Sequence, residues 1–202
     1  MKLYTAMAPN PLRVHVFLAE KGLEVPTVNL DVLKGDTRTS EFLEKNALGE
    51  VPVLELDDGR ILTESVAICR YLEALHPETP LMGSDAIEQA HIEMWNRRME
   101  LKIFFTIGQV GQHEFKFFAE SVEQNAIYAA SQRRALAHKW VWLNDEMSDG
   151  RAFVAGDSFT IADITGMAAL IVCGFANETI PDTLRHVKQW EQAVRTRPSW
   201  PM

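Results

Sequence analysis

Cysteine, basic charge and long apolar runs are all scarce in this 202-residue sequence. The two cysteines, Cys69 and Cys173, lie far apart in apolar helical contexts, with no Cys-x-x-Cys pair and no zinc-type ligand spacing. We therefore expect no metal site and a reducing, cytoplasmic compartment. No apolar run reaches the roughly 18 residues that a membrane span needs. The first residues lead straight into a predicted strand, so we expect neither a signal peptide nor a membrane partner.

The charge balance is acidic, with 28 Asp and Glu residues against 20 Lys and Arg residues and a formal net charge of −8. This excess argues against a nucleic acid or an anionic membrane surface as a partner. Hydrophobic residues make up 47% of the chain, which is normal for a globular protein with a buried core. A chain of this length suits one large domain or two small domains that share an interface.

Short strand and helix patterns alternate in the first part of the chain. Strands are predicted at 2–5, 27–32, 53–56 and 60–62, and helices at 13–21, 40–43 and 65–75. The dipeptide Asp58-Gly59 separates the last two strands and favours a type I′ hairpin turn. The order β-α-β-α-β-β-α predicts an α/β domain over residues 1–78.

The character of the sequence changes after Pro77 and Pro80, which read as a linker. Long helical patterns then follow, at 87–107, 121–147, from 160 onward and at 184–194. We expect Gly108 and Gly111 to interrupt or bend the first of these helices. The second part, residues 86–202, is therefore predicted to be an all-α bundle.

The Val51-Pro52 pair precedes a predicted strand. Proline cannot donate to a sheet ladder, so Pro52 belongs at a strand start or on an edge. If the peptide bond is cis, the N–H and C=O groups of Val51 face outward and could pair with a bound peptide. A plain edge proline is the alternative, and the residues alone leave both open.

The Glu64-Ser65 pair stands where a helix begins. Free N–H groups and the helix dipole attract a carboxylate there, and the Ser65 hydroxyl can add a hydrogen bond. With Glu64 accepting from an ammonium group, the pair could hold an α-amino acid head group. The alternative is that Ser65 only caps the helix. For Thr160-Ile161-Ala162-Asp163, which fits a capping box, the structural interpretation is the favoured one.

Five segments together resemble the cytosolic glutathione transferase family, over nearly the whole chain. Each is a weak signal alone, but their order and spacing are specific. They are Ala8–Pro11 with Arg13-Val14 and Leu18–Gly22, then Asn46–Leu54, Leu62–Ile68, Phe159–Asp163 and Arg197–Ser199. The resemblance implies a thioredoxin-like N-terminal domain, an all-helical C-terminal domain and a homodimer.

The resemblance also implies how glutathione is bound. Pro52 is implied to be cis, with the Val51 backbone pairing with the cysteinyl part of the tripeptide. Glu64 and Ser65 are implied to hold its γ-glutamyl head. For the glycine carboxylate, Arg38 is the preferred residue of the loop after the second strand.

One contact in the glutathione-binding half departs from the pattern of the family, and the residue for the glycine carboxylate has alternatives. Glu50 stands where many relatives carry lysine, which removes or reverses one common contact. Lys34 and Thr37 lie in the same loop as Arg38 and are alternatives to it.

The catalytic loop departs most from the family. Relatives hold the glutathione thiolate with a Tyr, Ser or Thr hydroxyl after the first strand, or use Cys there, whereas this chain has Ala8. We hypothesise that Asn10 positions the thiolate, with Thr5 and backbone N–H groups as lesser candidates. That Asn10 merely caps the first helix is an equally open interpretation.

The electrophile pocket of this architecture is expected between the N-terminal loop and the first long helix of the second domain. We predict that Met7, Phe104, Gly108 and Gln112 line it, since apolar walls suit an apolar or aromatic substrate. His113 is more simply read as a surface or rim residue.

The leading functional prediction is a glutathione transferase that conjugates glutathione to small hydrophobic electrophiles, as in detoxification. Its partners would be glutathione as cosubstrate and the electrophile. One alternative is a glutathione-dependent disulfide or peroxide reductase. The other is a non-catalytic protein that binds glutathione or hydrophobic ligands, which the Ala8 departure motivates.

Overall fold

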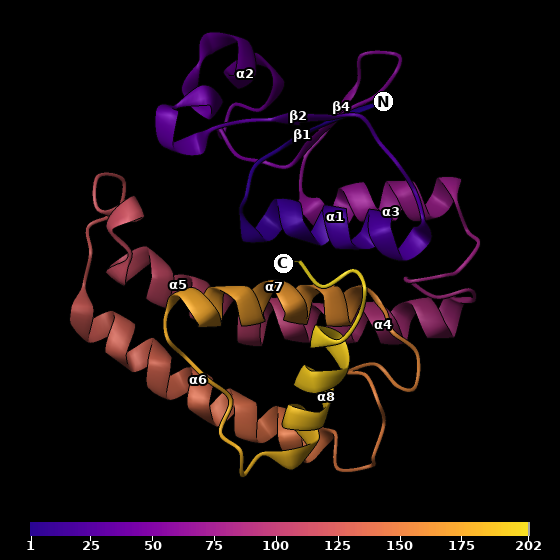
Figure 1. The fold of residues 1–202 in the computed structure, drawn as a ribbon, viewed down its shortest axis with the longest axis vertical. Coiled ribbons are helices and arrows are strands. Elements are labelled where there is room, and N and C mark those ends of the chain that lie inside the picture. The colour runs from indigo at the N-terminus through magenta and orange to yellow at the C-terminus, as the bar shows by residue number, and fades with distance from the viewer. Residues whose placement is uncertain (202) are drawn as a thin grey trace. The chain divides into compact units, whose positions relative to one another are not determined.

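The computed structural model describes residues 1–201, in which Met1–Pro80 together with Pro201 form one compact unit and Leu81–Trp200 form the other (Figure 1). Within residues 1–201, no helix combines the length and the apolar character needed to cross a membrane.

The first unit has the predicted order of elements. It consists of β1 (Lys2–Thr5), α1 (Pro9–Lys21), β2 (Thr27–Asn29), η1 (Val32–Lys34), η2 (Asp36–Arg38), α2 (Ser40–Lys45), β3 (Val53–Glu55), β4 (Ile61–Leu62) and α3 (Ser65–Leu75). The sheet order is β2-β1-β3-β4, with β1 parallel to β2 and antiparallel to β3. The predicted β-α-β-α-β-β-α order and thioredoxin-like class are confirmed.

Alternation along β1 explains how the helices cover the sheet. Leu3 and Thr5 are buried on one side, while the Tyr4 ring on the other side packs edge-on against Phe42 of α2. Helices α1 and α3 lie side by side on the opposite side of the sheet from α2 (Figure 1). Helix α1 ends at Gly22, whose φ of 65° is the left-handed conformation that glycine adopts most easily.

Two local predictions in the first unit are wrong. Helix α1 begins at Pro9, four residues before the predicted start, because Pro9 at the first helical position costs no hydrogen bond. The turn between β3 and β4 is not type I′, which needs positive φ at two residues. Only Gly59 has positive φ, of 83°, and Gly59 N–H donates to Leu56 C=O.

The second unit is helical. It consists of α4 (Ala86–Arg98), η3 (Met99–Phe104), α5 (Phe105–Glu114), η4 (Lys116–Phe118), α6 (Ala126–Glu146), α7 (Ile161–Phe175) and α8 (Arg185–Arg195). Helix α7 packs against α4, η3, α5 and α8, and its first ten residues are all buried. Its N-terminus carries the predicted capping box, in which the Thr160 and Asp163 side chains take part.

The long helix from 86 to 114 is interrupted at a different place from the predicted one. Gly108 and Gly111 lie inside α5, and the irregularity is the π-helical turn η3 before them. Gly111 is there for packing, since a Cβ atom at this position would lie 2.8 Å from the Phe115 ring. The prediction that these glycines interrupt the helix is wrong, because both lie inside α5.

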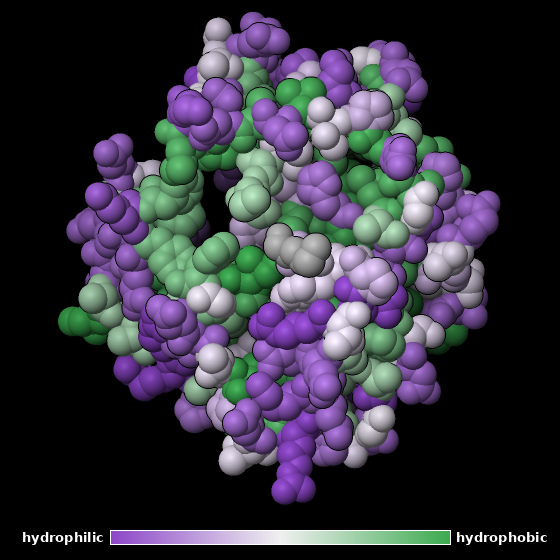
Figure 2. Space-filling view, in the orientation of Figure 1, coloured by the Kyte–Doolittle hydropathy of each residue, from purple (hydrophilic) through white to green (hydrophobic). Residues whose placement is uncertain are grey.

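Helix α8 shows most clearly why its sequence folds as it does. Val187, Trp190 and Val194 recur at helical spacing and are buried. The exposed side of α8 is hydrophilic in Figure 2. The strict separation of the two faces orients this helix on the rest of the second unit.

Candidate functional site

The N-terminus of α3 is left open. Glu64 occupies the N-cap position with φ 64° and ψ 113°, and no side chain in residues 1–201 caps the helix. Ser65 is the first helical residue, so the interpretation of Ser65 as the helix cap is wrong. The first N–H groups of α3 therefore keep their hydrogen-bonding capacity and the positive end of the helix dipole. Such an end binds carboxylates.

The Ser65 hydroxyl accepts a hydrogen bond from a buried arginine. Arg13 of α1 is 2% exposed, and its Nη1 donates to the Ser65 Oγ at 3.4 Å. Ser65 itself is 5% exposed, whereas Glu64 beside it is exposed to solvent. The site thus combines a fixed hydroxyl, an open helix end and a free carboxylate.

The Val51–Pro52 peptide bond is cis, as the resemblance implies. Neither the N–H nor the C=O of Val51 has a hydrogen-bond partner within the described part of the chain. Pro52 is buried, and the following strand, β3, pairs with β1 and packs against α3. The N–H and C=O of Val51 are thus available to pair with an extended peptide.

The loop before Val51 is braced by side chains. Arg38 Nη1 donates to the Leu48 C=O at 3.0 Å, and Asn46 Nδ2 donates to the Glu50 C=O at 2.8 Å. Arg38 is otherwise exposed, with donors left for an anion. The assignment of the glycine carboxylate to Arg38 stays a prediction.

The N-terminus of α1 is also uncapped among the described residues. Ala8 is its N-cap, so the interpretation of Asn10 as the cap is wrong. Pro9 and Pro11 lack an N–H group, which leaves Asn10 with the one backbone N–H of the first three helical residues. Asn10 is exposed, and its side chain has no hydrogen-bond partner within residues 1–201. Both its N–H and its amide can therefore donate to a ligand.

Thr5, a lesser candidate for the thiolate, is already engaged. Its Oγ1 lies 2.7 Å from Nε2 of His15 in α1, and Thr5 is 1% exposed. Burial lowers the pKa of His15, so its imidazole is neutral near pH 7. This pair joins β1 to α1 and does not face solvent.

The residues predicted for the electrophile lie in both units. Met7 is fully exposed in the loop between β1 and α1. Phe104, Gly108 and Gln112 are half-buried and spaced four residues apart, on one side of the stretch formed by η3 and α5. That these four residues form one pocket stays a prediction.

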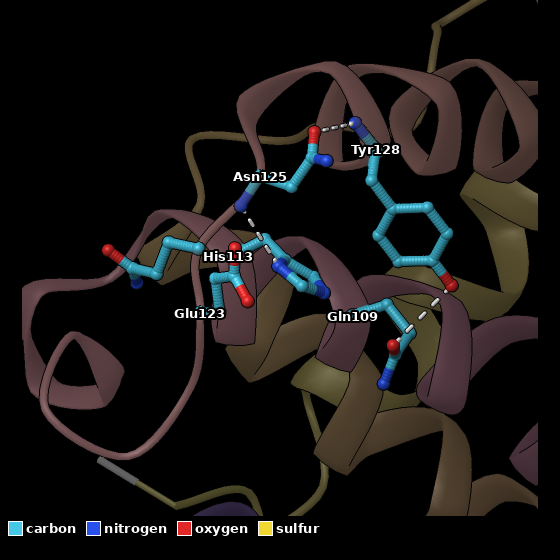
Figure 3. A pocket seen from close by; sticks show the side chains of 6 residues that line it. Gln109, His113, Glu123, Asn125 and Tyr128 are labelled. Carbon is cyan, nitrogen blue, oxygen red and sulfur yellow. Dashed lines mark hydrogen bonds between the residues drawn. The ribbon is translucent and has the colours of Figure 1, made fainter.

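A cavity of about 560 Å³ lies within the second unit, between α5 and the start of α6 (Figure 3). Its lining is polar and consists of Gln109, His113, Glu123, Gln124, Asn125 and Tyr128. None of the four predicted pocket residues, Met7, Phe104, Gly108 and Gln112, is in this lining, and His113, which is in it, was interpreted as a surface or rim residue.

Hydrogen bonds fix the shape of this cavity. The Asn125 N–H donates to His113 Nδ1 at 3.2 Å, which fixes the orientation of the ring in the cavity wall (Figure 3). The His113 and Tyr128 rings meet edge to face at 4.9 Å. Gln109 Nε2 donates to Gln112 Oε1 at 2.9 Å, so the cavity adjoins one predicted substrate residue.

The burial of Arg13 could have been predicted from the sequence, although its contact with Ser65, 52 positions away, could not. Arg13 lies one helical turn before Phe17, on the buried side of the predicted helix. A charged residue on such a face is rarely buried without a polar partner. The cavity beside His113 left no comparable signal, because its residues come from two helices and a loop.

Known proteins with similar sequences and structures share the two-unit organisation. The glutathione S-transferase N-terminal domain family matches residues 1–74, and the glutathione S-transferase C-terminal domain family matches residues 94–198. Glutathione S-transferase 2 of Saccharomyces cerevisiae is 35% identical over 199 residues, which cover 96% of this chain and 85% of the yeast protein.

A structure and a longer relative complete the comparison. The crystal structure of a glutathione S-transferase domain-containing protein from Marinobacter aquaeolei has a TM-score of 0.91 and 36% identity, covering 100% of both chains. Elongation factor 1-gamma 2 of Oryza sativa subsp. japonica is 29% identical over 95% of this chain, which spans 45% of that protein. On the strength of the two domain matches and the yeast relative, this chain belongs to the glutathione S-transferase family.

Proposed function

We propose that this protein is a glutathione transferase that conjugates glutathione to small hydrophobic electrophiles. The observation that carries the proposal is the open N-terminus of α3, with the Ser65 hydroxyl fixed and the Glu64 carboxylate free beside it. The γ-glutamyl head of glutathione has a carboxylate that suits the helix N-terminus and the Ser65 hydroxyl, and an ammonium group that suits the Glu64 carboxylate. The uncapped N–H groups at this helix start are available to such a carboxylate.

The remaining parts of glutathione are assigned to the same unit. The cysteinyl part would pair with the free N–H and C=O of Val51, next to the cis Pro52. The glycine carboxylate would meet Arg38, whose exposed guanidinium retains donors beyond its bond to Leu48. The proposal requires no metal, because glutathione supplies the nucleophilic thiol.

Activation of the thiol is assigned to the N-terminus of α1. Asn10 offers a backbone N–H and a side-chain amide there, and hydrogen bonds to a thiolate lower the thiol pKa. Asn10→Ala removes the amide alone. Titration of bound glutathione by thiolate absorbance should then give a higher thiol pKa than in the wild-type protein. An unchanged thiol pKa and turnover would contradict the role of the Asn10 side chain.

The electrophile would be held by Met7, Phe104, Gly108 and Gln112, and the active protein would be a homodimer. Leu101 and Phe105 are 55% and 58% exposed and lie one helical turn apart. Such an apolar pair suits burial by a second copy. We place this activity in the cytoplasm, in the detoxification of electrophiles, consistent with two buried, unpaired cysteines.

The protein's own thiols do not favour reduction chemistry. Burial raises the pKa of Cys69 and of Cys173, so neither supplies a thiolate near neutral pH. A glutathione-dependent reductase would therefore need a second glutathione in the electrophile pocket.

One preparation of the full chain tests the proposal against its alternatives. Binding of glutathione is measured first, followed by turnover with an aryl halide, a hydroperoxide and a small mixed disulfide. We expect binding and turnover with the aryl halide. Turnover confined to the other two substrates would make the protein a reductase, and binding without any turnover would make it a binding protein. Failure to bind glutathione would overturn the proposed function.

A further inference from the structure

We infer that Arg13 is a positioning residue for recognition of the α-carboxylate of the γ-glutamyl end of the ligand. The inference rests on the proposed binding of glutathione and adds a residue that does not itself line the site. Arg13 belongs to α1 and is 2% exposed, and its Nη1 contacts the Ser65 Oγ at 3.4 Å.

The chemistry of the two groups decides the direction of this hydrogen bond. A guanidinium only donates, whereas a hydroxyl has one proton to donate and lone pairs to accept. Ser65 Oγ therefore accepts from Arg13 and keeps its own proton for another acceptor. The open end of α3 is where that acceptor would lie, and a carboxylate is acceptor-only. Arg13 thus favours the orientation in which the Ser65 hydroxyl proton points toward the ligand.

The charge of Arg13 acts in the same direction. Arginine stays protonated even when buried, and a charge in a poorly screened interior acts more strongly than one in water. The layer between α1 and α3 also holds the ion pair of Lys21 and Glu73, joined at 2.8 Å. A carboxylate at the start of α3 would be attracted by the charge of Arg13 and by the positive end of the helix dipole.

A comparison of two ligands separates this role from a purely structural one. The first ligand is glutathione, and the second is 4-aminobutyryl-cysteinyl-glycine, which differs by loss of the α-carboxylate alone. Calorimetry of the full chain gives both dissociation constants for the wild-type protein, Arg13→Met, Arg13→Lys, Ser65→Ala and the Arg13→Met/Ser65→Ala double variant. The readout is the ratio of the two constants in each protein.

We expect Arg13→Met to weaken glutathione binding by about 10-fold or more, because a charge-assisted contact is lost. Binding of the 4-aminobutyryl peptide should change by less than about 3-fold, since it makes no contact with this subsite. Arg13→Lys keeps the charge without the planar guanidinium and should give an intermediate ratio. The double variant should lose less than the sum of the single losses, because both residues act on one carboxylate.

Several outcomes would overturn the inference. Equal weakening of both ligands in Arg13→Met and Arg13→Lys would make Arg13 a structural residue only. An unchanged ratio in both variants would also overturn it. If Arg13→Met does not fold, Arg13→Lys and Ser65→Ala carry the same comparison. A wild-type protein that binds neither peptide would instead overturn the proposed function, on which the inference rests.

Discussion

The N-termini of α3 and α7 are built from similar residues, but side chains cap the N-terminus of α7 and leave that of α3 uncapped. At α7, Thr160 Oγ1 accepts from the Ala162 N–H. The Asp163 carboxylate accepts from the N–H groups of Thr160 at 2.9 Å and Val154 at 3.0 Å, and from Trp190 Nε1 at 2.9 Å. At α3, no side chain of residues 1–201 accepts from the first turn.

The difference separates a helix end that serves the fold from one that can serve a ligand. Asp163 is fully buried, and all its hydrogen bonds lie within the second unit. Glu64 is exposed and held at a φ of 64°, which a non-glycine residue adopts at a cost. Side chains of the protein satisfy the N–H groups at the N-terminus of α7, whereas the N–H groups at the N-terminus of α3 remain available to a bound carboxylate.

The largest effect is expected from a substitution at the N-terminus of α7. Asp163→Ala removes the acceptor of four buried donors, which are the N–H groups of Val154 and Thr160, the Thr160 hydroxyl and Trp190 Nε1. We expect the free energy of unfolding to fall by about 3 kcal/mol or more. Urea denaturation followed by circular dichroism measures the change. Glutathione affinity of the folded fraction should stay within about 2-fold of wild type, because the two helix starts share no residue.

The matched control is Asp163→Asn, which keeps the size of the side chain and one acceptor oxygen. It should lose less stability than Asp163→Ala. If both variants are as stable as the wild-type protein, the capping box does not stabilise α7 and the comparison fails.

The second prediction concerns pH. Burial raises the pKa of Asp163 to about 6, although hydrogen bonds from Val154, Thr160 and Trp190 oppose that shift. An aspartate in an unfolded chain titrates near 3.9, so the folded protein binds an extra proton between about pH 4 and pH 6. The contribution of Asp163 to stability is therefore greatest below pH 4 and declines as the pH rises through 6, by about 3 kcal/mol at most.

Subtracting the free energy of unfolding of Asp163→Asn from that of wild type at each pH isolates this contribution, because asparagine does not titrate. The difference should shrink from pH 4 to pH 6. The same subtraction with Ser65→Ala should be flat, since no buried carboxylate lies at the start of α3. A difference that grows with pH for Asp163 would show that its hydrogen bonds outweigh its burial.

The third prediction compares one alanine substitution at each of the two helix N-termini. Ser65→Ala should weaken glutathione binding by about 10-fold and change the free energy of unfolding by less than about 1.5 kcal/mol. Thr160→Ala should do the reverse, with about 1–2 kcal/mol of stability lost and unchanged affinity in the folded protein. Calorimetry and urea denaturation on both variants give all four values. A loss of affinity in Thr160→Ala alone would reverse the assignment.

The sequence was enough to predict the fold because its signals are local. Apolar periodicity identified the helices, and the capping box at Thr160 located the start of α7. The predicted start of α1 was wrong because Pro9 was read as a helix breaker. Proline disrupts a helix interior but is accepted at the first helical position. The π-helical turn at Met99–Phe104 leaves no sequence signal, since it reflects how that stretch packs on α7.

The candidate site was predictable only where a feature of one segment sufficed. The Val51-Pro52 and Glu64-Ser65 pairs each carry their chemistry within two adjacent residues. Arg13 does not, because its contact with Ser65 spans 52 positions of the chain. Whether a helix start is capped also depends on backbone conformation, and the positive φ of Glu64 is not written in its residue type.

The smallest expected effect concerns that conformation. Glu64→Gly and Glu64→Ala both remove the carboxylate, so they should weaken glutathione binding equally, by about 3- to 10-fold. They differ in the backbone, because glycine adopts positive φ freely and alanine does not. Glu64→Gly should therefore be more stable than Glu64→Ala by about 1 kcal/mol in thermal unfolding. Equal stability would mean that the open start of α3 carries no backbone strain. A more stable glycine variant with weaker binding would mean that the chain accepts strain at Glu64 to keep a carboxylate where the ligand's ammonium group lies.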